Sequence, residues 1–140
     1  MTKNYRAVKV TKTSFLGIKT TYYKIQFQKT RLWGLIKFSW QDQYFVGVGH
    51  LYDGWVDYQS LIVQVNVHHF SEDEIPLIKD ILTILRNYPK IIIGIYQGNI
   101  IYMHPTTYKF FETGKEAIDY FKKYEHFVEE SITPIDDEEI

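Results

Sequence analysis

The first 40 residues alternate between apolar and polar side chains with a period of two, and this constrains the fold more than any other feature of the sequence. The three alternating runs cover residues 6–11, 22–28 and 35–40. This period is typical of antiparallel strands that bury one face and expose the other. Turn segments containing Gly17 and Gly34 separate the runs. Residues 5–40 are therefore predicted to form an antiparallel meander.

Two helices are predicted from capping boxes, in which a Ser or Thr and a Glu three residues later satisfy free N–H groups at a helix start. The first box is Ser71 with Glu74, and an apolar stripe at helical spacing follows it until Pro89. The residues of this stripe are Ile78, Ile81, Leu82 and Leu85. The second box is Thr113 with Glu116, which opens a helix near the C-terminus.

The remaining apolar runs predict strands on either side of the first helix. They are Tyr44–Val48, Leu61–Val67, Lys90–Tyr96, Ile100–Met103 and Thr106–Phe111. The whole order predicts an α+β fold, an antiparallel β-sheet of about six or seven strands with two α-helices packed on it. We expect one domain over residues 1–132 and an acidic tail over residues 133–140.

The size and composition of the chain exclude several classes of protein. A chain of 140 residues suits one domain with its own hydrophobic core. The absence of cysteine excludes disulfides, thiolate nucleophiles and thiolate metal ligands. The N-terminus does not resemble a signal peptide, and the longest apolar runs, such as Ile91–Ile95, fall far short of the ~20 residues that span a membrane. We therefore expect a soluble cytoplasmic protein without a membrane partner.

The net charge of −1 conceals a division along the chain. Residues 1–40 carry nine Lys and Arg residues and no Asp or Glu, whereas residues 41–140 carry seven basic and all 17 acidic residues. Such asymmetry points to an anionic partner, nucleic acid above all. The alternative is that basic side chains keep strand edges soluble, and that the acidic part of the chain neutralises them within the fold or across a dimer.

Aromatic residues are interleaved with the basic ones in this first segment, and together they predict a surface that contacts phosphates and stacks on bases. The predicted anion-binding residues are Lys9, Lys12, Lys19, Tyr22, Lys24, Lys29, Arg31, Trp33 and Lys37. The partner that we expect here is nucleic acid or a nucleotide-like ligand.

A glycine-rich segment in the middle of the chain is a second candidate, because Trp and Tyr in turns often anchor ligands and partners. Its residues are His50, Tyr52, Asp53, Trp55, Asp57 and Tyr58. With His68 or His69, its histidine and aspartates have the chemistry of a hydrolytic metal site. No spacing typical of a metal site, nucleophile elbow or phosphate loop occurs, so we predict no catalytic residue, metal or cofactor.

Three segments carry a resemblance to a known group of proteins: Lys19–Gln28, the sequence Trp33-Gly34-Leu35, and the pattern F-x-T-x-x-E-A at Phe111–Ala117. In these segments the chain resembles small uncharacterised phage and prophage proteins, in which a short basic and aromatic meander is followed by a helix that begins T-x-x-E-A. The resemblance covers the two ends of the chain but not residues 41–105. It implies a viral or mobile-element origin and carries no catalytic residue.

The sequence thus predicts a small non-enzymatic binding module that holds an anionic partner on its basic, aromatic N-terminal sheet. The first alternative is a structural or interaction protein, a viral subunit that self-assembles or binds a host protein. The second alternative is a metal-assisted hydrolase. If the protein is viral, its location is the host cytoplasm.

Overall fold

The computed structural model describes residues 2–62 and 67–131. The α+β class predicted from the sequence is confirmed, with two α-helices and eleven strands among these residues. The strands form three sheets, of four, five and two strands, where we expected one sheet of six or seven. The division arises because the chain leaves the N-terminal meander and pairs its next strand with one more than 40 residues away, which alternation alone does not specify.

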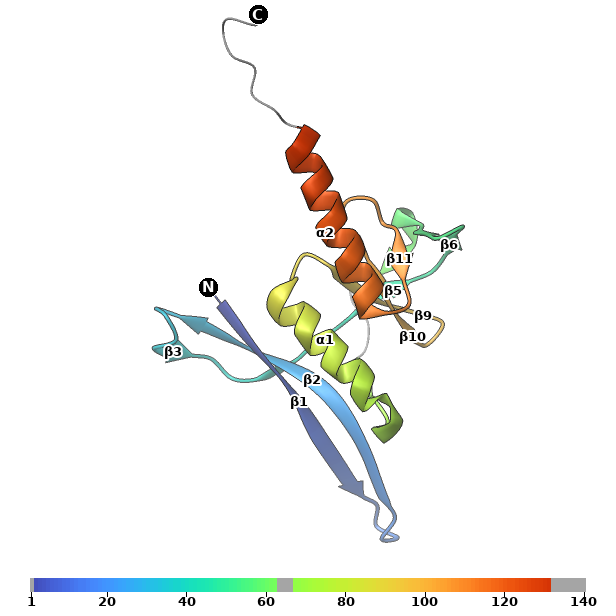
Figure 1. Ribbon diagram of the computed structural model, residues 1–140. Coiled ribbons are helices and arrows are strands. Elements are labelled where there is room, and N and C mark those ends of the chain that lie inside the picture. Colours follow the sequence, from blue (N-terminus) through green and yellow to red (C-terminus); the bar gives the residue numbers. More distant parts are fainter. Residues whose placement is uncertain (1, 63–66, 132–140) are drawn as a thin grey trace, which may run out of the picture.

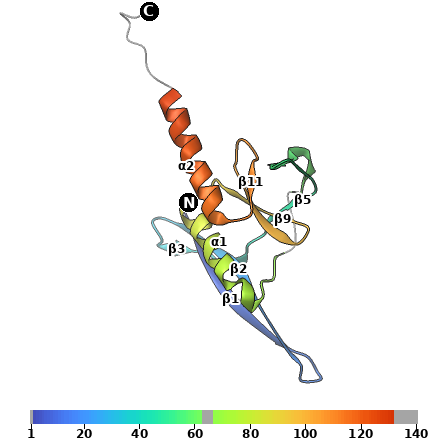
Figure 2. The same cartoon turned by 45° about the vertical axis from the view of Figure 1, so that its right-hand side comes forward.

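A long hairpin forms the first sheet and extends from the rest of the molecule (Figures 1 and 2). Strands β1 (Thr2–Thr13) and β2 (Lys19–Arg31) pair without a bulge from Thr2↔Thr30 to Thr13↔Lys19. Thirteen residues in a strand reach about 40 Å. Two short strands, β3 (Ile36–Lys37) and β4 (Gln41–Asp42), pair with the other edge of β2. The predicted strand at 35–40 is thus only two residues long.

The second sheet has the strand order β11-β10-β9-β5-β8. Its strands are β5 (Val46–Val48), β8 (Leu61–Ile62), β9 (Ile92–Tyr96), β10 (Asn99–Met103) and β11 (Phe110–Phe111). Strands β5 and β9 pair in parallel, and the other pairs are antiparallel. The predicted strand Leu61–Val67 begins with β8, and its residues 63–66 lie outside the described residues.

Both helices begin where the capping boxes predict. The N–H of Ser71 donates to the Glu74 carboxylate at 3.0 Å, and a single 3-10 turn, Glu72–Glu74, leads into α1 (Ile75–Asn87). The Thr113 hydroxyl donates to Glu116 at 2.9 Å at the start of α2 (Gly114–Ser131). The buried side chains of α1 are Ile78, Ile81 and Ile84. Leu82 and Leu85 of the predicted stripe are half-buried and pack against the core, and Ile84, which the stripe did not include, is fully buried.

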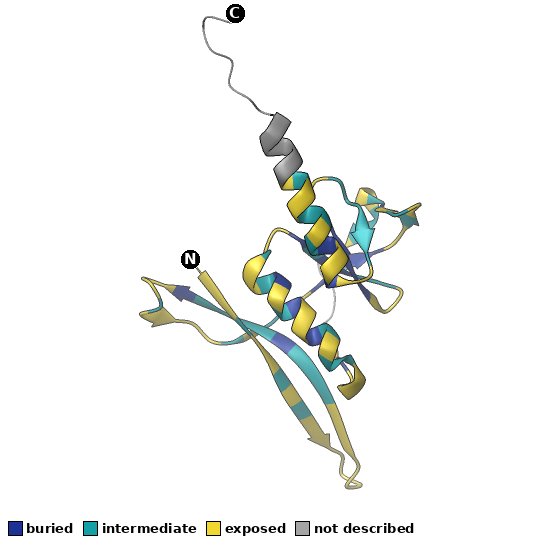
Figure 3. Ribbon diagram, viewed as in Figure 1, coloured by how far each residue is buried: buried dark blue, intermediate teal, exposed yellow. Residues whose placement is uncertain are grey.

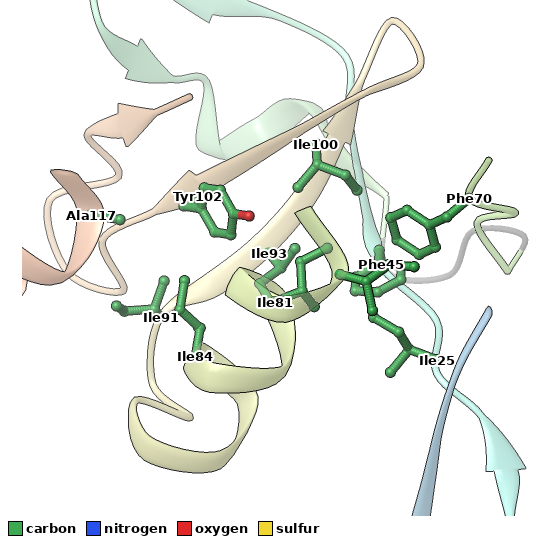
Figure 4. Close-up of a cluster of buried hydrophobic side chains, with 11 residues drawn as sticks. Ile25, Phe45, Phe70, Ile81, Ile84, Ile91, Ile93, Ile100, Tyr102 and Ala117 are labelled. Atoms are coloured by element: carbon green, nitrogen blue, oxygen red, sulfur yellow. The ribbon is translucent and has the colours of Figure 1, made fainter. Parts of the chain in front are cut away.

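Helix α1 lies between the long hairpin and the five-stranded sheet, and the main core forms on its two sides. Figure 4 shows Ile81 and Ile84 among Ile93 and Tyr102 of the sheet, with Ile25 of the hairpin nearby. The opposite face of the sheet buries a smaller cluster of Val48, Val56, Ile101 and Met103. Strand β10 is therefore buried on both faces, which explains its unbroken apolar sequence.

The third sheet is a small hairpin of β6 (Leu51–Tyr52) and β7 (Trp55–Val56) that covers the second cluster. Its turn is Asp53-Gly54, and both residues have positive φ, as the Asp-Gly pair favours. Figure 3 shows that exposed residues dominate the end of the long hairpin at the β1–β2 turn, while buried ones occur in the middle of β2 and near its C-terminal end, at Ile25 and Thr30. Neither described helix is long and apolar enough to cross a bilayer.

Candidate functional site

The two faces of the long hairpin have different surroundings. Side chains of a strand alternate between faces, and directly paired residues share a face. The odd-numbered side chains of β1 and β2, among them the fully buried Ile25, lie on the face toward α1 and the core, here named the inner face. The even-numbered ones lie on the outer face. The predicted anion-binding residues are therefore divided between both faces of the ribbon.

Four of the predicted residues, Lys9, Lys19, Lys29 and Arg31, are on the inner face. Lys12, Tyr22 and Lys24 are on the outer face, together with Lys37, which pairs with Thr30. Trp33 lies in the turn between β2 and β3. No single face of the sheet presents all nine residues, because an odd spacing between two residues of a strand places them on opposite sides.

Along the hairpin, the predicted residues separate into two groups. The tip cluster, Lys9, Lys12 and Lys19, is next to the β1–β2 turn. The turn cluster, at the opposite end, contains the predicted Lys29, Arg31, Trp33 and Lys37 together with Lys3, which was not predicted and pairs with Lys29. The predicted Tyr22 and Lys24 lie between the two clusters. Lys19 and Lys29 are ten positions apart on β2, which separates the clusters by about 30 Å.

The middle of the outer face is a closed polar network rather than a free basic surface. Lys24 Nζ lies 3.0 Å from Asp42 Oδ1, and Gln26 Nε2 donates to the same oxygen at 3.0 Å. Arg6 donates to Gln26 Oε1 through Nε at 3.0 Å and Nη2 at 2.8 Å. The hydrogen bond from Gln26 and the ammonium of Lys24 lower the pKa of Asp42. Lys24 and Arg6 are thus already engaged within the fold.

Several basic side chains of the hairpin each pack against an aromatic ring. Arg6 lies 4.1 Å from the centre of the Trp40 ring, and Lys3 lies 4.8 Å from that of Phe27. Arg31 is 5.6 Å from Phe38. The Tyr22 ring is covered on one side by His69, with ring centres 3.9 Å apart, so it is not a free stacking surface. Such cation–ring contacts hold the cations close to the sheet.

Two adjoining grooves lie at the turn cluster. One has a volume of about 370 Å³ and is lined by Thr2, Thr30, Arg31, Leu32 and Trp33. The second, of about 200 Å³, is lined by Lys29, Arg31, Phe38 and Gln41. Arg31 lines both, so its guanidinium can serve a ligand in either groove. The turn cluster thus combines concave surface, cations and aromatic rings.

The β1–β2 turn exposes an apolar group that sequence reasoning missed. Phe15 is 96% exposed, and Leu16 and Ile18 are also exposed. The sequence contains a signal for this group, because three apolar side chains flank Gly17 in a predicted turn. A turn has no strand face that could bury them, so they are expected to be exposed. Asp42, Trp40 and Arg6 were missed too, because their contacts cross three strands.

The second predicted group is spread over the β6–β7 hairpin and the 3-10 turn that follows it, and several of its side chains already have partners there. His50 packs against Tyr52 at 4.6 Å between ring centres, and Tyr58 packs against Tyr108 at 5.4 Å. The Trp55 ring faces Lys109, whose Nζ is 5.7 Å from its centre. The Asp57 carboxylate accepts the N–H of Gln59 at 3.1 Å and caps the 3-10 turn Tyr58–Ser60, a structural role. Asp53 lies in the β6–β7 turn, where its φ is positive.

The histidines proposed for a metal site also go to separate places. His68 lies 3.9 Å from Glu74 and 4.5 Å from the Phe70 ring, and burial lowers its pKa. His69 stacks on Tyr22 of the long hairpin. Within residues 2–62 and 67–131, no three His, Asp or Glu side chains converge in the way that a metal ion requires. The described geometry therefore does not assemble the set considered for a metal-assisted hydrolase.

His104 is a buried histidine with a structural role. The N–H groups of Thr106 and Thr107 both donate to its Nδ1 at 3.1 Å, so Nε2 carries the proton of the neutral ring. Nε2 is buried with no hydrogen-bond partner in the described part of the chain, and the ring packs 4.4 Å from that of Tyr124. Burial lowers the pKa of His104, and burial raises that of Tyr102. Burial thus favours the uncharged form of both side chains.

Comparison of the chain with protein-family models, with curated proteins and with solved structures finds no match.

Proposed function

We propose that the protein is a non-enzymatic binding module that holds nucleic acid on the turn cluster of its long hairpin. The observation that carries this proposal is the excess of positive charge there. Among the side chains that the structure describes, Lys24–Asp42 is the one Lys or Arg ion pair, so the turn cluster has no carboxylate within 4.0 Å. Residues 1–40 contain nine basic residues and no acidic residue.

Lys3, Lys29 and Arg31 are three cations at neighbouring positions on the inner face of the hairpin, and they repel one another unless an anion lies between them. A nucleic-acid backbone supplies that anion, and its binding releases condensed counterions, which favours association at low salt. The guanidinium of Arg31 can hold a phosphate with two hydrogen bonds, whereas Lys3, Lys29 and Lys37 act as point charges. A nucleotide-like small molecule uses the same chemistry. The resemblance to phage and prophage proteins implies a viral or mobile-element origin. A protein of that origin would bind nucleic acid in the host cytoplasm.

Fluorescence anisotropy with labelled single- and double-stranded DNA and RNA tests this proposal. The salt series runs from about 50 to 200 mM, where counterion release has a large effect. We expect affinity that falls steeply with salt, with a linear dependence of log K on log salt. Absence of binding to every polyanion at 50 mM salt, with the fold verified by circular dichroism, would refute the proposal.

A second candidate function is supported by the apolar residues at the β1–β2 turn. Phe15, Leu16 and Ile18 form an exposed apolar tip on an arm that extends from the molecule (Figure 1). Exposed apolar groups of this kind mark interaction surfaces. The protein would then be a structural or interaction subunit that self-assembles or binds a host protein. Sedimentation velocity over a range of concentrations tests self-assembly: a larger species that disappears in Phe15→Ser supports it, and a monomer at every concentration excludes it.

A further inference from the structure

The turn between β2 and β3 has a backbone conformation that its sequence does not favour. Leu32, Trp33 and Gly34 have φ of 53°, 55° and 88°, three consecutive residues in the left-handed region. Hydrogen bonds close the turn, from Gly34 N to Arg31 O at 3.2 Å and from Leu35 N to Leu32 O at 3.1 Å. Left-handed conformations are unfavourable for Leu and Trp, so the fold keeps this turn at a cost. Strain of this kind often occurs at functional sites.

The turn also holds the most exposed large hydrophobic side chain among the described residues. Trp33 is 100% exposed, and Leu35 beside it is 82% exposed. The other two tryptophans each have a cation against the ring, Arg6 for Trp40 and Lys109 for Trp55. Within the described residues, the Trp33 ring has neither an aromatic nor a cationic partner, so its faces are open.

The surroundings of Trp33 match one chemical class of ligand. It lines the groove of about 370 Å³ together with Arg31 and Leu32, and Arg31 also lines the groove that contains Lys29 and Phe38. A planar apolar ring, a guanidinium and an ammonium therefore lie along one path. Single-stranded nucleic acid has the complementary parts, a flat base with open faces and a phosphate on either side of it. In a duplex the bases are already stacked and paired, and exposing one is costly.

We propose that Trp33 is a stacking platform for an unpaired base and that Arg31 binds the adjacent phosphate, so that the protein prefers single-stranded nucleic acid to duplex. This inference rests on the proposed function, because it names the form of nucleic acid that the turn cluster takes. The left-handed turn already places Trp33 at the surface, so the ring does not have to leave a packed position when the ligand binds. Stacking tolerates any base, so the preference is for strandedness rather than for sequence.

The test compares Trp33→Ala with the unmodified protein on a labelled 20-nucleotide poly-dT strand and on a blunt DNA duplex of equal length. We expect Trp33→Ala to weaken single-strand binding by about 5- to 100-fold, the usual effect of removing one stacked aromatic ring, and to leave duplex binding within about twofold. Trp33→Phe should recover most of the loss, because Phe keeps a stacking face. Tyr44→Ala, at an exposed aromatic residue that is 51% accessible and outside the hairpin, is the matched control and should bind like the unmodified protein.

A spectroscopic readout separates stacking from a general effect on the fold. In the double variant Trp40→Phe, Trp55→Phe, Trp33 is the one remaining tryptophan, and poly-dT should quench its fluorescence whereas the duplex should not. If Trp33→Ala lowers the affinity for poly-dT and for the duplex equally, or lowers neither, Trp33 is not a stacking platform. Salt-dependent binding by the unmodified protein would still support the proposed function in that case. Absence of binding by the unmodified protein to either ligand at low salt would overturn both.

Discussion

The ion pair between Lys24 and Asp42 leads to a prediction that the sequence could not make. Lys24, Lys29 and Arg31 are on the same strand, and composition gives no reason to distinguish them. In the structure, Lys24 Nζ is 3.0 Å from a carboxylate oxygen, and no described carboxylate lies within 4.0 Å of Lys29 or Arg31. A lysine whose charge is already balanced by a carboxylate neutralises less phosphate charge, so it releases fewer of the cations condensed on the nucleic acid and contributes less to polyanion binding.

The expected magnitude follows from counterion release. Each phosphate contact contributes about 0.7 to the slope of log K against log salt on a single strand, and about 0.9 on a duplex. The double variant Lys29→Gln, Arg31→Gln removes two such contacts, so the slope on poly-dT should become shallower by about 1.4. Lys24→Gln should change the slope by less than about 0.3, well below one full contact.

Fluorescence anisotropy at five or more salt concentrations measures both slopes, with urea unfolding as a check on each variant. Lys24→Gln breaks a partly exposed ion pair, so its free energy of unfolding should fall by about 1 kcal/mol at most. A slope change for Lys24→Gln as large as that for Lys29→Gln alone would show that Asp42 does not withhold Lys24 from the ligand. No slope change in any of these variants would show that polyanions bind elsewhere.

Four further predictions concern stability and the acidic tail. Leu32→Asn should raise the free energy of unfolding by about 1 kcal/mol in urea titrations, because Asn tolerates the left-handed conformation that Leu does not. Leu35→Asn, outside that region, should have no such effect, and equal effects would exclude strain as the cause. Gly94→Ala should lower stability by about 1–3 kcal/mol, since its Cβ would lie 2.6 Å from Met103 Cε and 3.2 Å from a carbonyl oxygen; an unchanged midpoint would mean that the sheet adjusts freely. Burial lowers the pKa of His104, so the unfolded chain takes up its proton first as pH falls, and stability should decline from pH 7 to pH 5, less steeply in His104→Gln. Deletion of residues 133–140, which removes four acidic side chains, should tighten polyanion binding at low salt, and unchanged affinity would exclude competition by this segment.

Local patterns identified the elements whose stability depends on neighbours in the chain. The alternation around Ile25 predicted the long hairpin, and the Ser71–Glu74 and Thr113–Glu116 boxes predicted both helix starts. A capping box or an Asn-Gly type of turn acts within a few residues, so its sequence is sufficient evidence for it. The two-residue turn at Gln97-Gly98 between β9 and β10 is of the same kind.

The candidate site was predictable only in part. The sequence identified Lys29, Arg31 and Trp33 as residues suited to an anionic, base-containing ligand. It also counted Lys24 and Tyr22, whose partners Asp42 and His69 lie 18 and 47 residues away along the chain. Whether a charged or aromatic side chain is free depends on such distant contacts, and residue type does not reveal them.

The sequence by itself determined the α+β class, the hairpin, the starts of both helices and the basic character of the N-terminal segment, because these depend on side-chain period, capping and composition. Tertiary structure alone decided the parallel pairing of β5 with β9, the division into three sheets and the separation of the tip and turn clusters. It also decided that Trp33 is open while Trp40 is covered. The physical reason is that strand pairing and burial between distant segments depend on which of their surfaces are complementary. The apolar and polar pattern of the sequence indicates only which face of a strand or helix is buried.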